Sequence, residues 1–272
     1  MLNERSLSSR SPYTSFLRAK SESRRLSMAT CYDYTFARLL SKSAIDGILV
    51  GDSAAMVMHG HASTLPASVD LMRLHTEAVA RGAENKFIVA DMPFLSFRKG
   101  LCAALETASA LMIAGAHAVK LEGVDGHEDV IQRMVESGIP VMGHLGLQPQ
   151  SIHAAGGFRV QGRDDKSARS IARQAVRLEE LGAFAVVLEC IPAVLAGEIT
   201  AALHIPTIGI GAGAGCDGQI MVLQDLLGLN AEFRPKFSRP FLDGARCVVD
   251  TLRRFDEAVK AGTFPSAEES YS

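Results

Sequence analysis

Eight short apolar runs, separated by segments with helical spacing, constrain the fold of this chain more than any other feature. Short runs without polar alternation are typical of strands buried on both faces of a parallel sheet. We place strands at residues 26–30, 48–50, 87–90, 118–121, 139–142, 185–188, 207–210 and 219–223. Helical spacing occurs over residues 34–43, 69–81, 101–114, 127–136, 166–181 and 193–202, and a closing helix is expected over 241–260.

This alternation of strands and helices predicts a parallel sheet covered by helices. Eight strands within about 250 residues, with short connections, fit an α/β protein of the closed (β/α)8 TIM barrel type. We therefore predict a single barrel domain over residues 26–272. A doubly wound open sheet is the alternative, but no glycine-rich dinucleotide motif follows the first strand. Between the seventh and eighth strands there is room for little more than a turn.

Composition and charge restrict the class of protein. A net charge of −2 without a basic block argues against a nucleic-acid partner. The longest uncharged stretch, 199–216, contains a proline and several glycines, so we expect no membrane span. Five scattered cysteines without metal-ligand spacing indicate a reducing, cytoplasmic environment. Residues 1–25 are rich in Ser and Arg and lack an apolar signal core, so a disordered lead-in is favoured over a transit peptide.

Four of the apolar runs lead into a carboxylate: Asp52, Asp91, Glu122 and Glu189. The carboxyl-terminal ends of barrel strands meet on one face, where active sites lie. A buried charge is costly unless it is paired, hydrogen-bonded or bound to a metal. The first three acids follow neighbouring strands, and three oxygen ligands suit Mg²⁺. The alternative for any one acid is a helix cap or an arginine partner.

Other polar residues are expected at the same carboxyl-terminal face of the barrel, which we call the mouth. Lys120 and Glu122 are two residues apart on one strand, so both side chains face the barrel interior. Lys120 is a partner for a substrate carboxylate or an enolate, or else a structural ion pair. Glu189 lies across the mouth and suits a general base. His144 either donates to a ligand or satisfies a loop, and Cys190 is either a nucleophile or a buried inert thiol.

Longer motifs, in chain order, resemble the ketopantoate hydroxymethyltransferase family. They are TCYDYTFA (30–37), VGDSAAMVMHGHASTLP (50–66), ADMPF (90–94), VKLEG (119–123), GHLGLQPQS (143–151), GGFRVQGR (156–163), VLECIP (187–192), IGIGAG (208–213) and DGQIMVLQDLLG (217–228). The resemblance runs from about residue 26 to the C-terminus. The chain departs from the family at Ala54 and Ala55, where leucine and glycine are usual, and at Ala62, where an aspartate is common.

The resemblance implies a (β/α)8 barrel related to the phosphoenolpyruvate/pyruvate-utilising enzymes. It implies transfer of a hydroxymethyl group from 5,10-methylenetetrahydrofolate to 3-methyl-2-oxobutanoate through a Mg-stabilised enolate. The product would be 2-dehydropantoate, for pantothenate and coenzyme A biosynthesis. It also implies a homo-oligomer, typically a decamer. A related barrel lyase or mutase that needs no folate, and a catalytically inactive barrel, are the alternatives.

The resemblance also assigns roles to individual residues. Asp52, Asp91 and Glu122 would hold Mg²⁺. Asp52, Ser53, Asp91 and Lys120 would contact the oxoacid. Glu189 would accept the proton.

Overall fold

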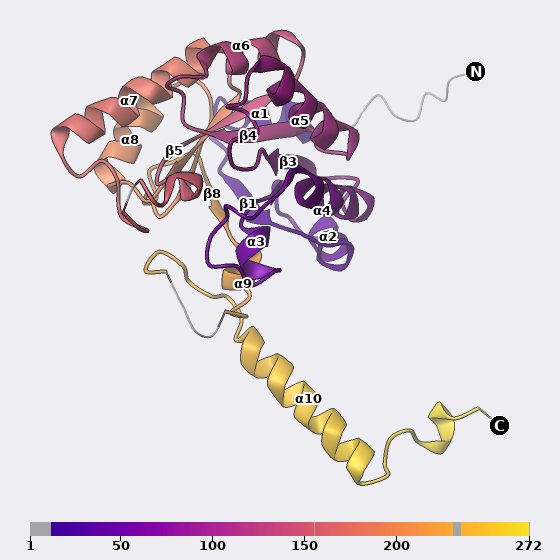
Figure 1. The fold of residues 1–272 in the computed structure, drawn as a ribbon. Coiled ribbons are helices and arrows are strands. Elements are labelled where there is room, and N and C mark those ends of the chain that lie inside the picture. The colour runs from indigo at the N-terminus through magenta and orange to yellow at the C-terminus, as the bar shows by residue number, and fades with distance from the viewer. Residues whose placement is uncertain (1–11, 155, 231–234, 272) are drawn as a thin grey trace. The chain divides into compact units, whose positions relative to one another are not determined.

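The eight apolar runs form parallel strands that close into a barrel, in chain order from β1 to β8 (Figure 1). The computed structural model describes residues 12–154, 156–230 and 235–271. The strands are β1 (Leu26–Thr30), β2 (Gly47–Val50), β3 (Phe87–Asp91), β4 (Ala118–Glu122), β5 (Val141–Gly146), β6 (Ala185–Glu189), β7 (Thr207–Ile210) and β8 (Gly218–Met221). Parallel pairing of β1 with both β2 and β8 closes the ring. The predicted fold is confirmed, and the open doubly wound sheet is wrong.

Helices connect the strands and cover the barrel (Figure 1). They are α2 (Tyr34–Ser41), α3 (Ala54–Val57), α4 (Val69–Gly82), α5 (Leu101–Ile113), α6 (Glu128–Glu136), α7 (Asp165–Glu180) and α8 (Ala193–Ala202). The apolar sides of the longer helices pack on the outward-facing strand residues in one large core. Residues 211–217, between β7 and β8, contain no helix, as the short connection predicts.

Strand β5 differs most from its predicted position. It begins at Val141 and continues to Gly146, whereas the sequence predicts residues 139–142. Pro140, which has no backbone N–H, precedes the strand, and the glycines after Met142 make the strand's second half look like a loop. Gly143 allows α7 to pack closely, since a Cβ there would lie 2.3 Å from Leu178 Cδ1 and displace that side chain. The extension places His144 within the strand rather than beyond it.

The N-terminal ends of the strands are covered by α1 (Pro12–Arg18). Phe16 is buried and packs against Phe87 and Phe184, with ring centroids 5.1 and 5.9 Å away. The predicted disordered lead-in over residues 1–25 therefore does not hold for residues 12–25, and residues 1–11 lie outside the described residues. Seven helical residues are too few to give a clear periodic pattern, so this helix could not be predicted from the sequence.

The chain divides into two compact units, Met1–Met221 and Val222–Ser272, where a single domain over 26–272 is predicted. The first unit contains all eight strands. The second contains α9 (Leu223–Leu226), α10 (Gly244–Lys260) and the 3₁₀ turn η3 (Ala267–Glu269). The predicted closing helix thus exists and begins at Gly244. Helix α10 is amphipathic, and its apolar residues Val248, Leu252 and Phe255 are exposed.

Two glycines that follow helices allow a matched stability test. Gly115 and Gly138 follow α5 and α6 with φ of 108° and 81°. A Cβ on Gly115 would lie 2.4 Å from Ala80 Cβ, whereas a Cβ on Gly138 meets nothing within 4 Å. Left-handed backbone costs an alanine about 1–2 kcal/mol, and overpacking adds about 1–3 kcal/mol. We expect Gly138→Ala to lower the free energy of unfolding by about 1–2 kcal/mol and Gly115→Ala by about 2–5 kcal/mol, measured by urea denaturation. Equal losses would show that contact with α4 does not constrain this turn.

Candidate active site

The four predicted acids gather at the carboxyl-terminal mouth of the barrel. Asp91, Glu122 and Glu189 are the last residues of β3, β4 and β6, and Asp52 follows β2 by two residues. Pairing of neighbouring strands sets Asp91 beside Lys120 and Glu122 beside His144. Inward-facing residues of neighbouring parallel strands therefore form the site, as the alternation of strand side chains requires.

Lys120 and Asp91 form a buried ion pair. The Lys120 Nζ lies 2.7 Å from Asp91 Oδ1. The other carboxylate oxygen of Asp91 accepts a 3.0 Å hydrogen bond from the backbone N–H of Asp52. Asp91 thereby ties the turn after β2 to the inward lysine of β4, and three of the predicted site residues are brought together.

Gln150 joins two of the acids and was not assigned a role from the sequence. Its side-chain amide donates to Asp52 Oδ2 at 2.8 Å and to the Met92 carbonyl at 2.9 Å. Its backbone N–H donates to Glu122 Oε2 at 3.1 Å. The residue lies on η2 (Pro149–Ser151), directly after β5, and is buried. A glutamine carries no charge pattern, so only its place in the GHLGLQPQS motif could have indicated it.

His144 connects the first three acids to Glu189. Its Nε2 lies 3.1 Å from Glu189 Oε2, and its Nδ1 lies 3.5 Å from Glu122 Oε1 and 3.3 Å from Lys120 Nζ. The ring therefore bridges two carboxylates across the mouth. Its described partners are side chains of the mouth rather than loop groups, and a hydrogen bond from His144 to a ligand stays a prediction.

Burial of these charges shifts their protonation. The pKa of Asp52 is raised to about 8, first by burial and then by the charges of Asp91 and Glu122. Burial alone would lower the pKa of Lys120, but the surrounding carboxylates outweigh it and raise the pKa. Burial and Lys120 lower the pKa of His144, yet its hydrogen bonds to Glu122 and Glu189 raise it to about 9. The site thus favours cations and resists collecting further negative charge.

Ser53 and Cys190 flank the acids in different ways. The Ser53 hydroxyl lies 2.9 Å from the Tyr32 hydroxyl, which fixes it beside Asp52. Cys190 follows Glu189 with φ of 47°, a left-handed conformation that is uncommon for a residue with a side chain. Burial and then the charge of Glu189 raise the pKa of its thiol to about 12. A thiol held protonated in this way does not suit a nucleophile.

The carboxylate oxygens of the mouth suit a hard divalent cation, although the described side chains do not form a complete coordination site. No group of three or more His, Cys, Asp or Glu within the described residues is arranged to hold a metal by itself. Asp91 Oδ1 nevertheless accepts no hydrogen bond of good geometry there, although Lys120 is close. Buried carboxylate oxygens from β2, β3 and β4 are the ligand type that Mg²⁺ prefers, and Mg²⁺ usually completes its shell with water or substrate.

A closed parallel barrel whose mouth combines buried acids, an inward lysine and a bridging histidine is typical of a (β/α)8 enzyme with its active site at the carboxyl ends of the strands. A family profile described as ketopantoate hydroxymethyltransferase matches residues 10–267. The chain belongs to the ketopantoate hydroxymethyltransferase family. The family predicted from the motifs is therefore confirmed, as is the prediction of an enzyme of this transferase class.

Curated relatives agree over nearly the whole chain. A protein of Bdellovibrio bacteriovorus named 3-methyl-2-oxobutanoate hydroxymethyltransferase is 56% identical over 253 residues, covering 93% of this chain and 96% of that protein. A protein of the same name from Coxiella burnetii (strain Dugway 5J108-111) is 53% identical over 254 residues, with the same coverage.

Solved structures share the fold at low sequence identity. Phosphonopyruvate hydrolase, in complex with oxalate and Mg²⁺, has a TM-score of 0.63 at 12% identity and covers 96% of this chain and 93% of its own. A 2,3-dimethylmalate lyase, a member of the PEP mutase/isocitrate lyase superfamily, has a TM-score of 0.59 at 16% identity and covers 97% and 93%. The predicted (β/α)8 barrel fold is confirmed. Across the described ranges, no helix is both long and apolar enough to span a membrane.

The contribution of the buried Lys120–Asp91 ion pair to stability can be tested by removing its partners. Removing one partner of a buried ion pair leaves an uncompensated charge and typically costs about 3–5 kcal/mol. We expect Lys120→Met to lower the free energy of unfolding by about that amount in EDTA, measured by urea denaturation. Lys99→Met, on an exposed residue, should have little effect. Adding Asp91→Asn to Lys120→Met should recover part of the loss, and strictly additive losses would contradict the pairing.

Proposed function

We propose that this protein transfers a hydroxymethyl group from 5,10-methylenetetrahydrofolate to 3-methyl-2-oxobutanoate, giving 2-dehydropantoate. The proposal rests on the connected polar network that runs from Asp52 to Glu189 across the mouth. Such a network combines a cation-binding side, made by Asp52, Asp91 and Glu122, with a single basic carboxylate on the opposite side. Membership of the family and the names of the curated relatives support the same reaction.

Mg²⁺ would be held by Asp52, Asp91 and Glu122, directly or through water. The buried carboxylates and the raised pKa of Asp52, which follows from burial and neighbouring negative charge, suit a site that needs a cation. When bound, Mg²⁺ would polarise the keto oxygen of the oxoacid and make the proton on C3 easier to remove. That the phosphonopyruvate hydrolase structure contains Mg²⁺ and oxalate is consistent with this role.

The chain's own residues bind the oxoacid and move its proton. Lys120 and Ser53, with the turn at Asp52, would orient the carboxylate and keto groups. Glu189 accepts the C3 proton, and its carboxylate is oriented for this by His144 Nε2 at 3.1 Å. The Lys120 ammonium, which burial does not neutralise, would stabilise the negative charge that develops on the substrate oxygen.

Carbon transfer then completes the reaction. The C3–H electron pair forms the new C–C bond to the methylene carbon of the donor. The bonds from that carbon to the donor nitrogens break, and the nitrogens recover protons. Water supplies the hydroxyl oxygen. The products are tetrahydrofolate and 2-dehydropantoate, so atoms and electrons balance without any oxidant or reductant.

Glu189→Gln tests the proton acceptor. A positioned general base typically contributes 10²–10⁴-fold, so we expect exchange of the C3 proton of 3-methyl-2-oxobutanoate in D₂O to fall by about that factor, followed by NMR. The KM for the oxoacid should change only a few-fold, because the amide keeps the shape of the side chain. Glu106→Gln, on the exposed face of α5, is the matched control.

The same assay separates the transferase from a related lyase or mutase. Wild-type protein should exchange the C3 proton and, when 5,10-methylenetetrahydrofolate is added, form 2-dehydropantoate. Exchange without any folate-dependent product would refute the transfer reaction. Unchanged exchange in Glu189→Gln would refute the role of Glu189 alone.

Metal binding can be measured apart from turnover. A ligand that binds the native state raises stability in proportion to the logarithm of its concentration over Kd. Saturating Mg²⁺ should therefore raise the melting temperature of the EDTA-treated protein, and Asp52→Asn should abolish most of that shift. Asp70→Asn, an exposed aspartate in the first turn of α4, should keep it. An unchanged shift in Asp52→Asn would contradict its assignment as a metal ligand.

The biological setting is also a proposal. We infer a role in pantothenate and coenzyme A biosynthesis, a cytoplasmic location and a homo-oligomer, decameric as in the family. The amphipathic helix α10, with Val248, Leu252, Phe255 and Val259 exposed along one side, supports an assembled state, because exposed apolar surface of this kind usually meets a partner. Neither a nucleic-acid nor a membrane partner is proposed.

A further inference from the structure

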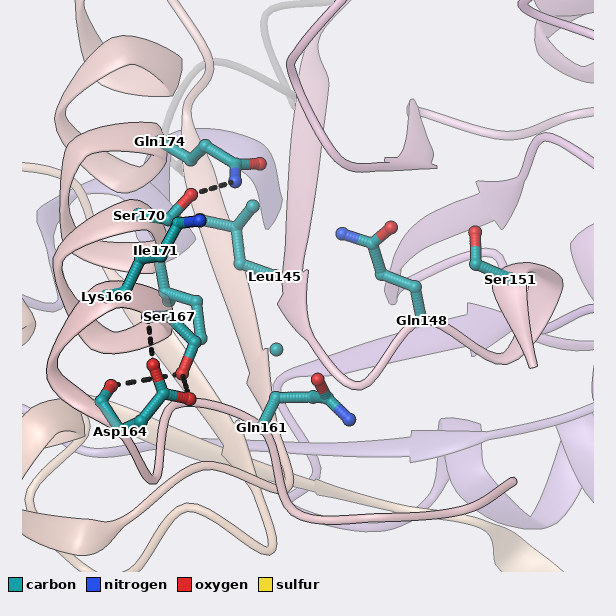
Figure 2. Close-up of a pocket in the computed structure, with 11 residues that line it drawn as sticks. Leu145, Gln148, Ser151, Gln161, Asp164, Lys166, Ser167, Ser170, Ile171 and Gln174 are labelled. Atoms are coloured by element: carbon teal, nitrogen blue, oxygen red, sulfur yellow. Dashed lines mark hydrogen bonds between the residues drawn. The ribbon is translucent and has the colours of Figure 1, made fainter. Parts of the chain in front are cut away.

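A cavity of about 530 Å³ lies beside the barrel mouth, between the end of β5 and the first turns of α7 (Figure 2). This volume is within the range of small-molecule sites. The side chains that matter for its chemistry are Gln148, Ser151, Gln161, Lys166 and Gln174. None of them contacts the acids, Lys120 or His144 in the hydrogen bonds of the site, so the proposed oxoacid and metal positions leave this cavity without a role.

The inner wall of the cavity adjoins the proposed base. Gly146, which lines the cavity, is the pairing partner of Glu189 on β6. The Leu147 N–H donates to the Glu189 carbonyl at 2.8 Å, and the Gln161 N–H donates to the Cys190 carbonyl at 2.9 Å. Both sides of the cavity are therefore anchored to the strand end that carries Glu189. The cavity therefore borders the backbone of the strand end that carries the proposed base.

The polar groups in the inner part are uncharged. In the described part of the chain, the side chains of Gln148 and Ser151 make no hydrogen bond. Gln161 donates from Nε2 to the Arg159 carbonyl at 3.0 Å, which leaves its amide oxygen as an acceptor. Figure 2 shows Gln148 and Gln161 on two sides of the same space. Because each primary amide offers both donors and an acceptor, these groups suit a neutral ring with alternating donors and acceptors.

One apolar side chain from β5 and one from α7 line the cavity, and the start of α7 carries charged groups. Leu145 and Ile171 provide an apolar surface on which a flat ring can pack. At the start of α7, the carboxylate of Asp164 is already occupied by the Ser167 N–H and hydroxyl, at 2.9 and 2.6 Å. Lys166, by contrast, forms no ion pair with any described residue and is exposed. A ligand with a neutral ring and a distant carboxylate matches this order of groups.

We propose that this cavity binds the one-carbon donor, with its pterin ring between Gln148, Ser151 and Gln161 and its glutamate tail near Lys166. The assignment rests on the proposed function, which names the donor as a reduced folate. It adds which residues recognise the donor, and it divides them into a ring site and a tail site. The ring site lies beside Glu189, so the methylene carbon would meet C3 of the oxoacid from the β5–β6 side of the mouth.

Titration calorimetry with two probes tests this division. Tetrahydrofolate carries both ring and tail, and 6-methyltetrahydropterin carries the ring alone. Titrations use the full chain with Mg²⁺ and 3-methyl-2-oxobutanoate present. Since a lost hydrogen bond to a buried polar group typically weakens binding about tenfold, Gln161→Leu should raise Kd for both probes by about that factor. Lys166→Met should weaken tetrahydrofolate a few-fold and leave the pterin unchanged.

Two further variants keep the result interpretable. Ser151→Ala, at an exposed residue that packs little, should also weaken both probes, which excludes misfolding as the cause. Gln132→Leu, a glutamine on the exposed face of α6 that pairs with Glu136 at 2.9 Å, should weaken neither. In steady-state assays, Gln161→Leu should raise KM for 5,10-methylenetetrahydrofolate about tenfold and KM for the oxoacid less than twofold.

The possible outcomes distinguish a failure of the donor-site proposal from a failure of the proposed transferase function. Wild-type Kd values in both Gln161→Leu and Ser151→Ala would overturn the cavity as the donor site, although folate-dependent product from the wild-type protein would leave the transferase intact. If Lys166→Met weakened both probes equally, the tail assignment would be overturned. Absence of folate-dependent product from the wild-type protein would instead remove the proposed function itself.

Discussion

The excess of negative charge at the barrel mouth is the constraint on which the rest of the site depends. Asp52, Asp91 and Glu122 are all buried, and among the residues that the structure describes Lys120 is the one ammonium paired with any of them. A low-dielectric interior makes such a cluster unfavourable unless each oxygen has a partner. The surrounding structure can be understood as the set of groups that supplies those partners.

The segment after β5 supplies two of these partners, both from Gln150. The amide of Gln150 donates to Asp52 and its backbone N–H donates to Glu122, so one residue holds the acids that follow β2 and end β4, on either side of β3. The left-handed backbone at Gly146, where a Cβ would lie 2.2 Å from the Glu189 carbonyl, lets the chain turn closely over β6. The same turn therefore fixes the acids on one side and adjoins the proposed base on the other.

Much of this was predictable from the sequence, for a clear physical reason. Parallel strands end at one face, so acids that follow strands must converge even when they are far apart in the chain. The positions of Asp91, Lys120 and Glu122 follow from strand alternation alone. His144 and Gln150 do not, since their partners are fixed by where β5 ends, and glycines at 143 and 146 hide that boundary. The helix at Pro12–Arg18 escaped prediction because its one buried aromatic, Phe16, gives no repeating pattern.

His144 explains how the two sides of the mouth can work as one site. Its ring lies 3.5 Å from Glu122, one of the proposed metal ligands, and 3.1 Å from Glu189, the proposed base. The pKa of the ring, raised to about 9 by its bonds to these carboxylates against burial and Lys120, favours the imidazolium that donates to both. A proton acceptor must be oriented without being tied to the metal ligands by a shared proton or by direct contact. A histidine between the two carboxylates meets that requirement, because it fixes the direction of Glu189 while its own proton stays on the ring.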